Sequence, residues 1–176
     1  MRLLVPMLAA VAMVAATPAQ AMTKEQLDCP LSTVTTEFAD RLSVVMIQGE
    51  EAGSAEDYID QLIAISDGCV KSSGLSEDQA TTYFKYTLAV VPRSAYIRQL
   101  DAAGLNVASI DTVLEFGPGL RNPVIDEVSE DQAGKIIDAQ IAKGVDIEKV
   151  DPSAWEKVGG YASATSLMYA ALRELP

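Results

Sequence analysis

Apolar residues recur at intervals of three and four along most of the chain, and this spacing predicts helices. The first segment, from Pro30 to Gln48, is expected to be one helix whose apolar stripe consists of Leu31, Val34, Phe38, Leu42, Val45 and Met46. After a glycine-bracketed turn, Ser54 is the predicted N-cap of a second helix, which ends near Cys69. These two helices are therefore expected to form an antiparallel hairpin.

Two capping boxes mark further helix starts, at residues 76–79 and 129–132. In each box, a serine oxygen and a glutamine side chain can pair with backbone donors that the start of a helix leaves free. The first box begins a helix that continues through Pro92 toward Leu100, either as one helix kinked at the proline or as two in sequence. The second box begins a helix that runs to Gly144.

Single residues signal the remaining helix boundaries. Asn106 is the predicted N-cap of a short helix over residues 107–116, and Asp151 opens the last helix, in which a glycine pair at 159–160 could make a break. Sustained period-two alternation is missing from the sequence, so a sheet is not expected. Residues 22–176 are thus predicted to form an all-α, single-domain bundle of about five to seven helices.

The two cysteines, Cys29 and Cys69, are predicted to form a disulfide. At about 1.5 Å per residue, the returning helix brings the chain back near its start, so the two cysteines meet at the open end of the hairpin. A crosslink there would stop the two helices from splaying apart. The alternative is a reactive redox pair, but that chemistry usually uses a C-x-x-C arrangement, which this sequence lacks.

The N-terminus has the pattern of a cleavable secretory signal peptide over residues 1–21. Arg2 precedes an apolar run from Leu3 to Ala16, and the following Ala19-Gln20-Ala21 gives the small-x-small pattern that signal peptidase accepts. The run is shorter than the roughly 20 residues that a membrane span needs. We therefore expect a periplasmic or secreted protein, with no membrane span after processing, in a compartment that permits disulfides.

The charge balance and the missing histidine exclude several classes of function. The chain has 25 acidic and 13 basic residues and a formal net charge of -12, which opposes binding to nucleic acid or anionic lipid and favours a cationic partner. High negative charge also keeps exported proteins soluble. With no histidine, Ser-His-Asp catalysis and most zinc sites are ruled out. The sequence also lacks the phosphate-loop, dinucleotide and EF-hand motifs, so we expect no cofactor or metal.

A glycine- and proline-rich segment is the best candidate for an interaction site, because prolines limit flexibility while glycines permit unusual backbone angles. This candidate loop consists of Phe116, Gly117, Pro118, Gly119, Leu120, Arg121, Asn122 and Pro123. A second candidate is a basic-aromatic patch near Pro92, formed by Arg93, Tyr96 and Arg98. The alternatives are a tight connection between helices for the loop, and a helical ion pair with Asp101 for Arg98.

These observations favour an exported, non-enzymatic binding or interaction protein, whose partner is another exported protein or a small molecule. It could protect or inhibit an exported partner. The alternative is a small helical hydrolase that acts on cell-envelope glycans through carboxylates, with Glu115 as the candidate acid. A carboxylate of raised pKa in a deep pocket would favour the enzyme, whereas a rigid projecting loop or an apolar surface would favour the binding protein.

Overall fold

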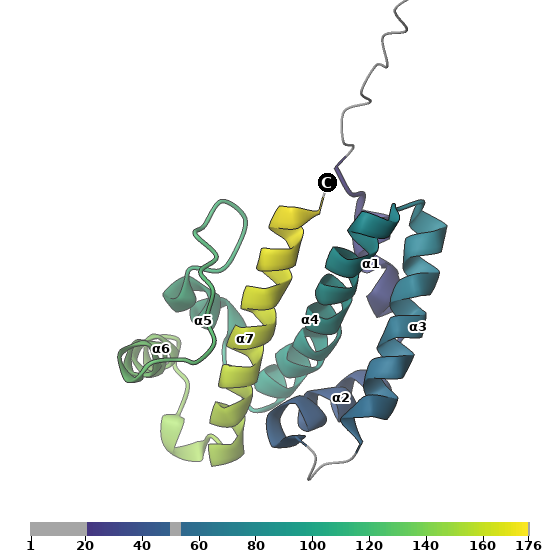
Figure 1. Ribbon diagram of the computed structural model, residues 1–176. Helices are drawn as coiled ribbons and strands as arrows, with labels where there is room; N and C mark the ends of the chain where they lie inside the picture. The colour runs from purple at the N-terminus through teal and green to yellow at the C-terminus, as the bar shows by residue number, and fades with distance from the viewer. Residues whose placement is uncertain (1–20, 50–53, 176) are drawn as a thin grey trace, which may run out of the picture.

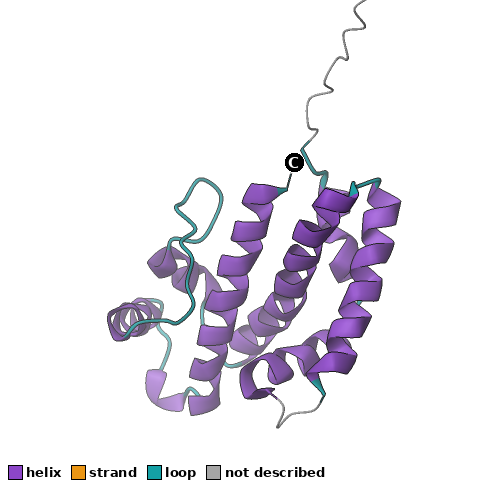
Figure 2. Ribbon diagram, in the orientation of Figure 1, coloured by secondary structure: helices purple, strands orange, loops and turns teal. Residues whose placement is uncertain are grey.

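Every regular element in the computed structural model, which describes residues 21–49 and 54–175, is helical (Figures 1 and 2). The elements are α1 (Lys24–Thr33), α2 (Thr36–Gln48), α3 (Ala55–Ser73), α4 (Glu77–Ala102), α5 (Val107–Leu114), α6 (Glu130–Ala142), the 3₁₀ helix η2 (Ile147–Lys149) and α7 (Pro152–Glu174). The predicted all-α, single-domain bundle is confirmed. Across these two ranges, no helix is long and apolar enough to cross a lipid bilayer. Apart from Ala21, the predicted signal peptide lies outside the described residues.

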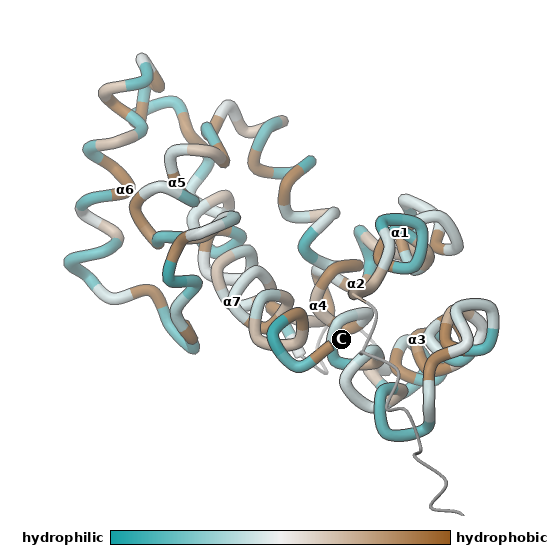
Figure 3. The backbone as a smooth tube through the Cα atoms, turned by 90° about the horizontal axis from the view of Figure 1, so that it is seen from above, coloured by the Kyte–Doolittle hydropathy of each residue, from teal (hydrophilic) through white to brown (hydrophobic). Residues whose placement is uncertain are grey.

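Helices α4 and α7 lie side by side at the centre of the bundle. Helices α1, α2 and α3 lie on one side of this pair, and α5 and α6 lie on the other (Figure 3). The core has two clusters of buried side chains. The first cluster gathers on the side of α1 to α3 and includes Leu42, Leu62 and Tyr83. The second gathers on the side of α5 and α6 and includes Ile110 and Ile136. Each cluster includes residues of both α4 and α7, so this helix pair holds the two sides together.

The close approach of α4 and α7 depends on Gly160. A Cβ atom at this position would lie 2.6 Å from Cζ of Tyr96, whereas a Cβ at Gly159 would meet nothing within 4 Å. Tyr96 is only 2% exposed, and its hydroxyl donates a hydrogen bond to the carbonyl oxygen of Ser43 in α2 at 2.9 Å. The glycine pair therefore makes no break in α7. Its second member instead provides space for a buried ring.

The prediction of one helix over residues 30–48 is wrong, because the helical backbone is interrupted between α1 and α2. Val34 is extended (φ -82°, ψ 149°), and the side chain of Thr35 caps α2 by accepting a hydrogen bond from the backbone N–H of Phe38 at 3.2 Å. Helix α1 begins earlier than expected, at a capping box headed by Thr23. The apolar spacing continues across the break, so periodicity alone did not reveal it.

The disulfide between Cys29 and Cys69 is confirmed, with a Cα–Cα distance of 5.9 Å. Because of the break, it joins α1 to α3 instead of closing a two-helix hairpin. One hydrogen bond reinforces this junction, since the amide of Gln26 donates to the carbonyl oxygen of Ser73 at 3.1 Å. From α4, the hydroxyl of Tyr83 donates to the carbonyl oxygen of Gln26 at 2.5 Å, and the hydroxyl of Tyr86 donates to that of Leu27 at 3.0 Å. Helix α1 is thus attached both to α3 and to α4.

Most of the other predicted helix boundaries are confirmed. Asn106 accepts a hydrogen bond from the backbone N–H of Ser109 at 2.9 Å, and α5 ends at Leu114, two residues earlier than predicted. The capping box headed by Ser129 is present at the start of α6. Helix α4 is one continuous helix through Pro92. The short helix η2 was not predicted.

Candidate functional site

The candidate loop follows α5 and is anchored by Phe116. This side chain is 3% exposed and stacks on Tyr169 of α7, with ring centroids 6.2 Å apart. Phe116 therefore belongs to the core and not to a surface that a partner could touch. The connection leaves the core at Gly117, is exposed from Pro118 onward, and rises beside α7 (Figure 1). We call residues 117–124 the presenting loop.

Asn122 closes the presenting loop on itself. Its side-chain oxygen accepts from the backbone N–H of Gly117 at 2.8 Å, and its side-chain nitrogen donates to the carbonyl oxygens of Gly117 and Leu120 at 2.9 and 3.1 Å. The backbone of Asn122 is left-handed (φ 47°), a conformation that asparagine tolerates better than most residues. Arg173 of α7 donates to its carbonyl oxygen at 3.1 Å. The loop is therefore fixed both internally and against the central helix pair.

The presenting loop exposes Pro118 and three larger side chains to solvent. Leu120 is 50% exposed and Val124 is 70% exposed, while the Arg121 side chain is 79% exposed and forms an ion pair with Glu115. The loop thus offers two large apolar side chains and one cation on a strongly acidic protein. A fixed backbone lowers the entropy that a partner would have to remove on binding.

Replacing Asn122 by alanine is expected to lower the free energy of unfolding by about 1–2 kcal/mol, because the variant loses the loop hydrogen bonds and places alanine in a left-handed conformation. Amide exchange at Gly117 should accelerate more than exchange in α7. Asn122→Gly separates the two causes, since it removes the same hydrogen bonds without the conformational cost. Equal Gly117 exchange in wild type and both variants would show that Asn122 does not close the loop.

The predicted basic-aromatic patch is not one surface. Successive residues of a helix are rotated by about 100°, so Tyr96 and Arg98 point to opposite sides of α4. Tyr96 is buried, and Arg98 forms an ion pair with Asp40 of α2 at 2.7 Å, not the helical pair with Asp101 that was the alternative to a patch. Arg93 faces α7. These three residues therefore serve three different contacts.

Arg93 instead belongs to a polar cluster that joins three helices. Its guanidinium donates to the hydroxyls of Thr165 and Tyr161 at 2.9 and 3.1 Å and lies 5.2 Å from the centroid of the Tyr161 ring. The Tyr161 hydroxyl in turn donates to Asp111 of α5 at 2.5 Å. Burial raises the pKa of Tyr161 above the ordinary range of a phenol, so it stays a donor. We did not predict this cluster, because its members are far apart in sequence.

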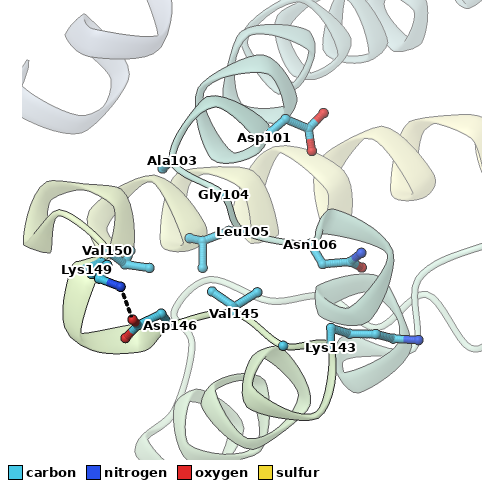
Figure 4. Close-up of a pocket in the computed structure, with 11 residues that line it drawn as sticks. Asp101, Ala103, Gly104, Leu105, Asn106, Lys143, Val145, Asp146, Lys149 and Val150 are labelled. Carbon is cyan, nitrogen blue, oxygen red and sulfur yellow. Dashed lines mark ion pairs between the residues drawn. The ribbon is translucent and has the colours of Figure 1, made fainter.

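A groove of about 530 Å³ lies where the connections after α4 and α6 meet η2 (Figure 4). Leu105, Val145 and Val150 contribute its apolar lining, and Lys149 forms an ion pair with Asp146 at 2.7 Å at its edge. Glu115 is not among its lining residues. In the part of the chain that the structure describes, no group of three His, Cys, Asp or Glu side chains is placed to hold a metal ion.

Comparisons with protein-family models, with curated proteins and with solved structures give no match for this chain.

Proposed function

We propose that this protein is an exported, non-enzymatic binding protein that contacts another exported protein through its presenting loop. The observation that carries this proposal is the combination of a closed backbone and outward side chains at residues 117–124. Asn122 and Arg173 hold the backbone, while Leu120, Arg121 and Val124 are exposed. The signal-peptide pattern and the disulfide support export.

The chemistry of the loop suggests the kind of surface that it would meet. Leu120 and Val124 are apolar side chains exposed beside a cation, a mixture that suits the apolar centre and polar rim of a protein interface. Arg121 is available to a partner because its ion pair with Glu115 is largely exposed, and such pairs contribute little to stability. An apolar surface with an acidic margin is therefore the partner that we expect.

No observation of this kind favours the alternative, a carboxylate-dependent hydrolase. Its candidate acid, Glu115, ends α5 with a left-handed backbone (φ 58°) and is held by the guanidinium of Arg121. A glycosidase acid needs instead a cleft in which its proton is retained for the leaving group.

Site-specific photo-crosslinking in the exporting cell tests the proposal. A photoreactive residue in place of Leu120 or Val124 is expected to give one discrete protein adduct. Arg121→Ala should weaken that adduct while changing the free energy of unfolding by less than about 0.5 kcal/mol. Ile141 of α6 is the matched control position, because its side chain is 55% exposed and lies on a different element.

Two outcomes would contradict this proposal. The first is no adduct from either loop position in cells where the protein is present and folded. The second is the same adduct, at the same yield, from Ile141, since this would indicate contact that does not depend on the loop.

A further inference from the structure

A separate apolar pocket of about 250 Å³ lies between α6, the N-terminal half of α7 and the segment that precedes α6. Its walls include Ile136 and Val158, which are 1% and 4% exposed, together with Val128 and Trp155, which are partly buried. Trp155 is the one tryptophan of the chain. We call this site the Trp155 pocket.

Gly159 contributes to the wall of the Trp155 pocket without a side chain. This residue lines the pocket, and a Cβ atom built on it would meet nothing within 4 Å. An engineered apolar cavity of about 150 Å³ can hold benzene. A pocket of about 250 Å³ therefore has room for an aromatic ring with a short substituent.

The charge at the Trp155 pocket comes from Glu127 and Glu156, and no lysine or arginine is among the lining residues. Both carboxylates are exposed, and within residues 21–49 and 54–175 neither has an ion-pair partner. Two unpaired anions beside apolar walls complement a cation that carries an apolar group. Trp155 also lines the pocket, and indole rings attract ammonium groups.

We propose that the Trp155 pocket binds a small organic cation in which an aromatic ring or short alkyl group carries an ammonium. The apolar group occupies the space beside Ile136 and Val158, and the ammonium lies near Glu127 and Glu156. This site is distinct from the presenting loop, so its ligand does not depend on the proposed protein partner.

Titration with benzyltrimethylammonium tests this proposal, with the fluorescence of Trp155 and calorimetry as independent readouts. We expect saturable binding with a Kd below about 5 mM, the range open to a ligand of this size. Benzyl alcohol and phenylacetate, which are neutral and anionic, should bind at least about tenfold more weakly. Equal binding of either compound, or no saturation by the cation below about 5 mM, would overturn the proposal.

Two sets of variants assign the binding to this pocket. Gly159→Leu fills the space and should abolish binding, while the double variant Glu127→Gln, Glu156→Gln should weaken it about tenfold. Glu56→Gln with Glu77→Gln is the control, since it removes the same charge from exposed positions at the starts of α3 and α4. Circular dichroism confirms that each variant is folded. Wild-type affinity in folded Gly159→Leu, or a loss in the double variant no greater than in the control, would also overturn the proposal.

Discussion

Replacing Gly160 by valine is expected to lower the free energy of unfolding by about 3 kcal/mol, near the upper end of the effects of overpacking a core. The new Cβ would lie 2.6 Å from Cζ of Tyr96 and 2.9 Å from its hydroxyl oxygen. The Tyr96 ring cannot move aside freely, because its hydroxyl donates a hydrogen bond to the carbonyl oxygen of Ser43 in α2. Either the tyrosine loses that hydrogen bond, or α7 moves away from α4.

Gly159→Val is the matched control, because it makes the same substitution one residue earlier in the same helix. A Cβ there meets nothing within 4 Å, so the change in unfolding free energy should stay within about 1 kcal/mol. Chemical denaturation of the two variants measures the difference. Similar stabilities would mean that α4 and α7 do not approach each other closely at Gly160.

Loss of the disulfide is the second large effect that we expect. Cys29→Ser and Cys69→Ser should each lower the free energy of unfolding by about 2–5 kcal/mol, and the chain-entropy model gives about 4 kcal/mol for a sequence separation of 40. Either substitution removes the same constraint, so the two variants should be equally stable. Denaturation with and without reductant measures the effect, and reductant should change only the wild type.

Mass analysis supplies the control for the cysteine variants. The non-reduced protein should be two hydrogens lighter than the reduced form, and thiol titration of the native protein should find no free thiol. Two titratable thiols in the native, folded protein would contradict the crosslink.

Local signals in the sequence were enough to predict most of the helices of the fold. Polar caps such as Asn106 and Ser129 satisfy backbone donors of their own helix, so their effect can be predicted without knowing the neighbours. The break at Thr35 has the same kind of signal, but the apolar spacing across it indicated one helix. The role of Gly160 had no local signal, because it depends on a ring that α4 brings to the same place.

The candidate sites also combine features that the local sequence predicts with features that depend on the folded chain. The glycine and proline content of the presenting loop indicated its position, whereas its closure depends on Asn122, whose contacts only the folded chain shows. The prediction of a patch of Arg93, Tyr96 and Arg98 could have been rejected from the sequence, because helix geometry alone places the last two residues on opposite sides of α4. The Trp155 pocket could not be predicted, because residues from two helices and a loop form its walls.

The division of the core into two clusters also affects how the molecule opens. The crosslink lies within the cluster on the side of α1 to α3, so it resists local unfolding there and gives no such protection on the side of α5 and α6. The presenting loop and the Trp155 pocket both lie on the unprotected side. We therefore expect both proposed contacts to lie in the part of the molecule that opens at the lower free energy, and ligand-binding elements are usually drawn from such parts.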